Sequence, residues 1–249
     1  ARPLWAWLCE PTGEPYLIGD GQERTEPWFF GQPVGGIPRY DARQFVGAVT
    51  RFTAGIPWRV RLGNMQTLDS HDTARFATNA PAEAIPLAVG LSMTLPGMPV
   101  LFAGDEFGLV GADGEASRTP MPWGTESDPE VAARLDLYRQ LIALRRRHPG
   151  LANGGLRWVH VDQNAVVFVR ESAEESILVL AATTDADVTL PSAALLGAER
   201  AEALFGDAAL AAAADGRVGI RSTGPTFAAW ALPGVDVPES REGSGDGDA

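Results

Sequence analysis

The chain of 249 residues contains a single cysteine, Cys9, so no disulfide can form within it. Basic residues are also scarce, because 20 Lys and Arg stand against 32 Asp and Glu, a formal net charge of -12. Nucleic-acid binding normally needs a basic patch, so this balance argues against a nucleic-acid partner and suits an uncharged ligand. The lone thiol and the absence of a recognisable leader lead us to expect a cytoplasmic protein.

Long apolar runs are missing as well. No stretch of about 18 apolar residues occurs, so the sequence predicts no membrane-spanning helix and no membrane partner. His148 and His160 have no companions at metal-ligand spacing, and the segment 113–115 lacks the ligand series of a calcium loop. We therefore expect neither a metal nor any other cofactor. Apolar residues still make up 45% of the chain, which is enough for a real core.

The first 150 residues favour a β/α arrangement. One helix is expected within the Pro- and Gly-rich segment 1–63, capped by Asp41 and ended by Pro57. A strand, an almost wholly apolar helix and a second apolar strand follow, which is the pattern of a parallel sheet. These three elements are expected at residues 64–69, 82–94 and 99–102, and a long loop at 105–127 and an amphipathic helix at 129–147 come after them.

A different pattern begins after Pro149-Gly150. Short apolar or alternating runs separated by turn residues predict an all-β domain over 151–234, in the form of a small antiparallel sandwich. The expected strands lie at 156–161, 165–170, 176–181, 187–190, 217–221 and 226–232. The last segment, 235–249, is acidic, carries three glycines and has few apolar residues, so it is expected to be a disordered tail.

The pair His71-Asp72 is the strongest functional signal. It lies within the segment Leu68-Asp69-Ser70-His71-Asp72-Thr73, where a predicted strand gives way to a polar turn. An imidazole beside a carboxylate at a strand end can bind a pair of sugar hydroxyls. A simpler reading is that Ser70 or Asp72 caps a short helix and that His71 is a structural residue.

Two later segments favour the sugar-binding interpretation over helix capping. They are Pro96-Gly97-Met98-Pro99-Val100-Leu101-Phe102-Ala103-Gly104-Asp105-Glu106 and Arg118-Thr119-Pro120-Met121-Pro122-Trp123. With His71-Asp72 they resemble the last part of the barrel in the α-amylase family of glycoside hydrolases. Residues 2–8, 33–39 and 56–59 resemble a bacterial, α-glucosidase-like and oligo-glucosidase-like branch of that family.

The resemblance implies a fold class of α/β plus all-β. Residues 1–150 would be the C-terminal portion of a (β/α)8 TIM barrel, with its seventh and eighth strands and their flanking helices. Residues 151–234 would be the small antiparallel β-sandwich that follows the barrel in the family.

The resemblance also assigns roles to individual residues. Asp72 would be the carboxylate that stabilises the transition state, and His71 would bind substrate hydroxyls. Arg118 and Trp123 would bind the sugar, although Arg118 could instead be a loop arginine paired with Glu115 or Asp113. Asp105 and Glu106 are expected to support the site from behind without touching the substrate.

Two further carboxylates of the family have no counterpart here. The nucleophilic aspartate of a Gly-x-Arg-x-Asp segment and the acid/base glutamate do not occur, and 150 residues fall short of the roughly 250 that a complete barrel takes. We therefore expect the C-terminal part of a longer retaining glycosidase acting on α-linked glucosides, inactive alone and partnered by the missing N-terminal half of the barrel. The alternatives are a non-catalytic glucan-binding or structural chain, and part of a transglucosylase or trehalose-forming relative.

Overall fold

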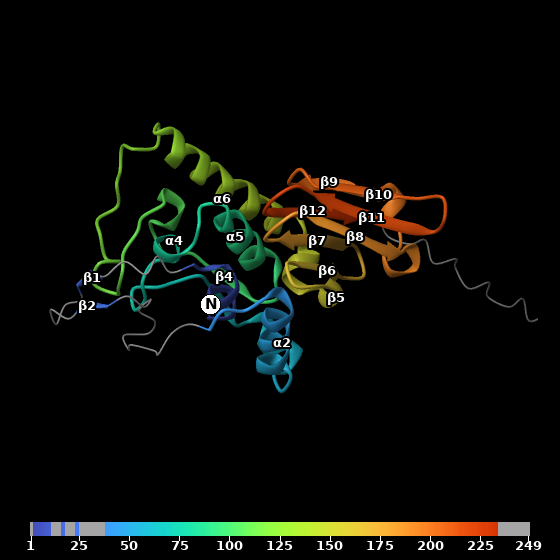
Figure 1. Ribbon diagram of the computed structural model, residues 1–249, viewed down its shortest axis with the longest axis horizontal. Helices are drawn as coiled ribbons and strands as arrows, with labels where there is room; N and C mark the ends of the chain where they lie inside the picture. The colour runs from blue at the N-terminus through green and yellow to red at the C-terminus, as the bar shows by residue number, and fades with distance from the viewer. Residues whose placement is uncertain (1, 11–15, 18–22, 25–37, 234–249) are drawn as a thin grey trace, which may run out of the picture.

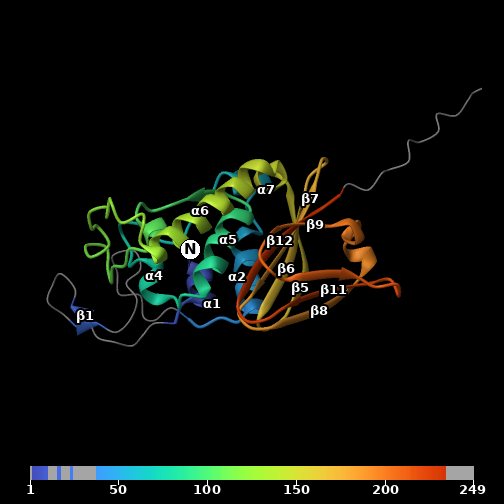
Figure 2. The ribbon, with the colours of Figure 1, turned by 90° about the horizontal axis from the view of Figure 1, so that it is seen from above.

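The computed structural model describes residues 2–10, 16–17, 23–24 and 38–233. The expected tail at 235–249 lies outside the described residues, as do 33–37 of one resembling segment. Helices and loops form one end of the molecule and antiparallel strands form the other, and α6 runs from the first toward the second (Figures 1 and 2).

The described residues before position 63 include three helices, where the sequence predicted one. They are α1 (Arg2–Leu8), α2 (Ala42–Thr53) and α3 (Trp58–Leu62). The Asp41 carboxylate accepts the Gln44 N–H and the Gln44 side chain accepts the Asp41 N–H, a capping box that confirms the predicted start of α2. Pro57 lies just before the first residue of α3, where proline's fixed φ and missing N–H are tolerated. The expectation of a single helix was therefore wrong.

A parallel pair of strands follows, as predicted. β3 (Met65–Thr67) pairs with β4 (Met98–Val100), and α4 (Phe76–Asn79) and α5 (Ala84–Thr94) connect them. Ten of the eleven residues of α5 are buried, because the helix packs against α1 and α6 and against strands of the sandwich. Its apolar composition on all sides follows from that position.

The helix α6 (Pro129–Arg147) has the bounds that the sequence predicted. The Asp128 carboxylate caps its first turn and Pro129 occupies its first position, where a missing N–H costs nothing. At its basic end the Arg145 guanidinium donates to the carbonyls of Met93 and Gly97. α6 is thereby tied to the end of α5, and α7 (Pro149–Asn153) leads into the strands.

The strands that follow α7 in the described chain form two antiparallel sheets. The five-stranded sheet has the order β5-β6-β7-β12-β9 and the three-stranded sheet has the order β10-β11-β8. The strands are β5 (Gly155–Val161), β6 (Ala165–Glu171), β7 (Ser176–Ala182), β8 (Ala186–Pro191), β9 (Glu202–Phe205), β10 (Ala209–Ala212), β11 (Arg217–Ser222) and β12 (Thr226–Leu232). The sequence did not predict β9 and β10, which are short and mostly exposed.

The five-stranded sheet is covered on both faces. Leu178 and Leu180 of β7 pack toward the three-stranded sheet. Ile177 and Val179 of the same strand belong to a second cluster that continues into α1, α5 and α6. A strand that is buried on both faces favours apolar residues along its length, which explains the apolar runs 165–169 in β6 and 177–182 in β7.

Arg170 lies fully buried where the helices meet this sheet. Its guanidinium donates to the carbonyl oxygens of Leu151, Gly154 and Gly155 at 2.8, 2.8 and 2.9 Å, and also to that of Thr94 at the end of α5. Burial, together with the charges of Arg145 and Arg61, lowers the pKa of Arg170 to about 9. Backbone carbonyls therefore hold this cation between the two parts of the chain.

Candidate active site

The turn that carries His71 and Asp72 begins directly after β3. The Asp72 N–H donates to Ser70 Oγ at 3.2 Å, and the Ser70 N–H donates to Thr73 Oγ1 at 3.0 Å. These short-range bonds fix the backbone of the turn and leave both site side chains facing solvent. The His71 and Asp72 side chains are 62% and 54% exposed, with Nε2 of His71 lying 3.4 Å from Oδ1 of Asp72.

Arg118 reaches this turn from the loop that follows β4. Its Nη2 atom lies 3.8 Å from Asp72 Oδ1, and its Nε donates to the carbonyls of His71 at 3.3 Å and Gly114 at 3.2 Å. In the described contacts its carboxylate partner is Asp72, whereas the sequence left pairing with Glu115 or Asp113 open. An exposed pair of this kind contributes about 0–1 kcal/mol, so a polar ligand could replace it at little cost.

The helix-capping alternative for Ser70 and Asp72 is wrong. The helix that follows, α4, begins at Phe76, and the Phe76 N–H donates to Asp69 Oδ2 at 2.6 Å. Asp69 is buried and faces inward, while Asp72, three residues later, faces outward. The carboxylate that supports the helix start is therefore distinct from the one that faces solvent.

Asp105 lies beneath the site in the interior. Its carboxylate contacts the Arg75 guanidinium at 2.7 Å and the carboxyl group of Asp69. Burial first, and then the charge of Asp69, raises the pKa of Asp105 to about 8, and burial also raises the pKa of Asp69. Glu106 instead accepts the Gly104 N–H at 2.8 Å. Asp105 thus contacts groups in the interior, whereas Glu106 contacts the backbone of the loop that follows β4.

Sequence reasoning missed Arg75, which is 1% exposed. Besides Asp105, its guanidinium donates to the carbonyls of Ala103 at 2.8 Å and Ser117 at 3.0 Å, and it lies 4.1 Å from the centre of the Phe102 ring. A signal was present in the sequence. Two aspartates near the ends of neighbouring predicted strands require a cation, and Arg75 is the only one between the site turn and the helix at 82–94.

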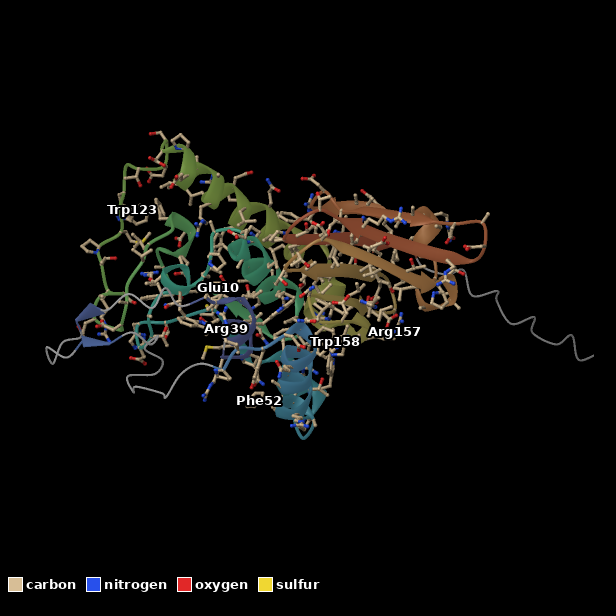
Figure 3. All side chains as sticks on the ribbon, viewed as in Figure 1. Glu10, Arg39, Phe52, Trp123, Arg157 and Trp158 are labelled. Carbon is tan, nitrogen blue, oxygen red and sulfur yellow. The ribbon has the colours of Figure 1, made fainter. Side chains whose placement is uncertain are left out.

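Trp123 projects from the loop at the end of the molecule opposite the sandwich (Figure 3). Its side chain is 73% exposed, and its ring meets the edge of Phe107 with the ring centres 5.8 Å apart. A cavity of about 640 Å³ lies against the same loop, lined in part by Phe107, Pro122 and Arg134. Among the contacts of the described residues none joins Trp123 to Asp72 or Arg118, so the structure brings together only the other three residues of the predicted pocket.

The other tryptophans of the described chain have structural surroundings. Trp5 and Trp7 are buried in the core, and Trp58 packs beside the Arg61 guanidinium, 5.1 Å from its ring centre. Within the described ranges no group of three or more His, Cys, Asp or Glu side chains could hold a metal ion. None of the helices placed by the structure is both long and apolar enough to cross a bilayer.

Two parallel strands joined by a buried helix, with polar side chains beyond their carboxyl ends, match the repeating unit of a (β/α)8 barrel. The antiparallel sandwich that follows makes this the C-terminal part of such a barrel together with its appended β domain.

Comparison with known proteins shows which proteins the chain resembles. No family model matches the sequence. Neopullulanase 2 of Thermoactinomyces vulgaris is 34% identical over 169 residues, covering 65% of this chain and 28% of the relative. A cyclomaltodextrinase of a Bacillus species is 28% identical over 195 residues, covering 70% and 34% respectively. The solved Nostoc punctiforme debranching enzyme superposes with a TM-score of 0.71 at 21% identity, covering 92% of this chain and 46% of that one.

The chain is similar to the C-terminal part of α-amylase-family glycoside hydrolases. It spans about a third of the length of the curated relatives that it matches.

Proposed function

We propose that this chain supplies part of the active site of a retaining glycosidase that hydrolyses α-linked glucosides. Asp72 would stabilise the transition state, His71 would bind sugar hydroxyls, and Arg118 and Trp123 would bind the sugar. The observation that carries this proposal is the meeting of His71, Asp72 and Arg118 at the carboxyl end of a parallel strand pair. Their side chains are about half exposed, which leaves their polar atoms available to a ligand.

The chemistry of glycoside hydrolysis fits this arrangement. A retaining glycosidase passes through an oxocarbenium-like transition state between a nucleophile and an acid/base, and hydrogen bonds to sugar hydroxyls strengthen as positive charge develops. A carboxylate such as that of Asp72, paired only weakly with Arg118, can accept hydroxyl protons and also offset that charge. We propose that the nucleophile and the acid/base come from the remaining strands of the barrel.

The proposed partner is therefore the protein segment that completes the barrel. Within the described residues the two outer edges of the β3–β4 pair form no ladder, and Met65 and Met98 on these strands are 68% and 52% exposed. Unpaired strand edges with exposed apolar side chains favour pairing with further strands.

Hydrolysis of p-nitrophenyl α-glucoside and maltose tests the proposal, first with the purified chain and then with the chain joined to the rest of the barrel in a full-length protein. We expect no turnover by the chain alone and turnover by the full-length protein. Asp72→Asn should abolish that turnover, while the matched control Glu115→Gln, an exposed carboxyl group of the neighbouring loop, should retain it. Full activity of Asp72→Asn would refute the assignment.

Two other functions fit the same residues. A non-catalytic glucan-binding chain is favoured by the single carboxylate at the exposed turn, and isothermal titration calorimetry with maltose would show binding without hydrolysis. A transglucosylase or trehalose-forming enzyme would use the same residues on another acceptor. Analysis of the products from maltose separates these enzymes, because hydrolysis releases only glucose and transfer builds a new disaccharide or a longer sugar.

A further inference from the structure

We infer that Gly114 and Ser117, held from below by Arg75, are positioning residues that fix Arg118 beside Asp72. The relevance of this positioning to sugar binding and catalysis rests on the proposed function, but the positioning itself does not. Its geometric basis is a set of contacts between the loop at 111–118 and the turn at 70–75.

Gly114 lets the loop approach the site turn. A Cβ atom at this position would lie 2.8 Å from the His71 carbonyl oxygen and 3.4 Å from Asp72 Cα. The first distance is too short for any side chain, so a residue larger than glycine would move the loop away from the turn. The Gly114 carbonyl also accepts the Arg118 Nε–H at 3.2 Å, so the same residue sets the direction of that side chain.

Ser117 joins the loop to the turn on the other side. Its side chain is fully buried, and Oγ lies 2.8 Å from the Thr73 carbonyl and 2.6 Å from that of Asp113. Thr73 follows Asp72 in the chain and Arg118 follows Ser117. A hydroxyl group bound at this point therefore links the residues adjacent to the two charged side chains.

Arg75 anchors the arrangement from the interior. It donates through Nη2 to the Ser117 carbonyl at 3.0 Å and through Nη1 to Asp105 at 2.7 Å, while its own N–H donates to the Gly111 carbonyl at 2.8 Å. One buried guanidinium thus connects the turn, the loop and the end of the second strand. The exposed ion pair contributes little energy of its own, so these contacts set the distance between Arg118 and Asp72.

The test uses the three histidines of the chain as NMR probes in the absence of sugar. The His71 carbonyl accepts the Arg118 Nε–H, and the His71 ring faces Asp72, so removing the guanidinium should shift the His71 Cε1–Hε1 signal. His148, paired with Glu175, and His160, paired with Asp162, report on the rest of the fold. The measured quantity is the shift of the His71 signal caused by Arg118→Ala in each background.

We expect this shift to fall at least about threefold in Gly114→Ala and in Ser117→Ala, as coupled neighbours require, and to keep its full size in Gly47→Ala. Gly47→Ala is the matched control, because a Cβ there meets nothing within 4 Å. An unchanged shift in both test backgrounds, with intact His148 and His160 signals, would overturn the inference. Collapse of the His148 and His160 signals in both variants would also overturn it, because the residues would then hold the fold and not the distance.

Failure of the proposed function would look different. A chain that neither binds nor hydrolyses α-glucosides, even when joined to the rest of the barrel, would still show the coupling between Arg118 and the loop. If the His71 shift instead stays unchanged in both test backgrounds while the full-length protein is active, the glycosidase assignment stands and only the positioning roles are removed.

Discussion

Asp69 and Asp105 are in contact in the interior, with Arg75 as the cation bound to Asp105. The Asp69 Oδ1 atom is buried and receives no hydrogen bond from N–H or O–H groups of the described residues. A proton held by Asp105 would supply the missing donor, in agreement with the raised pKa of that group. One guanidinium and one retained proton then balance two carboxyl groups without leaving an unpaired charge in the core.

This pair predicts a dependence of stability on pH. The folded protein holds the Asp105 proton up to about pH 8, whereas the unfolded chain releases it near pH 4, so folded molecules bind more protons between these values. The free energy of unfolding should therefore fall, by on the order of 1–3 kcal/mol, as the pH rises from 5 to 8. The amide of Asp105→Asn mimics the protonated carboxyl, so in this variant the contribution of Asp105 to the pH slope of the free energy of unfolding should disappear. Urea unfolding at several pH values measures it.

The control for this experiment is Asp136→Asn, an exposed position on α6 whose carboxylate accepts a hydrogen bond from Gln140. It should keep the slope of the parent protein. If Asp105→Asn also keeps that slope, then the Asp105 carboxyl is ionised throughout this range and the shared proton does not exist.

Replacement of glycine by alanine should change the free energy of unfolding in opposite directions in two helices. In α5 a Cβ on Gly90 would lie 2.5 Å from the ring of Phe227 on β12, so Gly90→Ala should destabilise by about 1–3 kcal/mol through overpacking. In α2 Gly47 faces open space, so Gly47→Ala should stabilise by about 0.5–1 kcal/mol through helix propensity. Thermal unfolding followed by circular dichroism measures the stability change of each variant. An increase in stability of Gly90→Ala would show that α5 and β12 do not pack closely.

Removal of the Arg170 guanidinium should be costly. Arg170→Met leaves the carbonyls of Thr94, Leu151 and Gly154 buried without that donor, for an expected loss of about 3–5 kcal/mol. The matched change Arg221→Met removes an exposed pair with Asp187 and should cost no more than about 1 kcal/mol. Urea denaturation curves compare the two variants, and similar midpoints would show that the buried contacts contribute little.

Trp123 should matter for ligand binding and not for stability. Its exposed ring contacts Phe107 only at an edge, so Trp123→Ala should change the free energy of unfolding by less than about 1 kcal/mol. Loss of an aromatic surface for a sugar ring should weaken maltose binding by a factor of about 2–12. Trp58→Ala, at a partly exposed tryptophan beside Arg61, is the control for calorimetry. Equal affinities of the two variants would remove Trp123 from the proposed pocket.

Much of the fold could be predicted because local signals agreed with burial. α6 carries a capping aspartate, a first-turn proline and a basic end, and β6 and β7 contain the apolar runs 165–169 and 177–182. β9 and β10 carry no such signal, since they are short edge strands whose ladders are formed with the later strands β12 and β11. α3 was missed because Pro57 marks an end to one helix and also permits the start of the next.

The site was predicted only in part. The sequence pointed to His71, Asp72 and Arg118 one at a time, but the 3.8 Å approach of Arg118 to Asp72 depends on a loop whose path is set by tertiary contacts. Arg75 and Ser117 were missed for the same reason, because each acts through carbonyl groups that lie far away in the sequence. A pattern of residue types cannot reveal a backbone partner.

The five-stranded sheet has a consequence for recombination between proteins. Its helix-facing side belongs to the same apolar cluster as Trp5, Leu87 and Leu141. Cutting the chain near Pro149 would therefore expose apolar surface of this shared core to solvent on both pieces. We expect a single calorimetric melting transition for the whole chain, since the helices and the five-stranded sheet share one apolar cluster. The sandwich is therefore not an interchangeable module. A different helical partner would have to leave room for the ring of Phe227, as Gly90 does here.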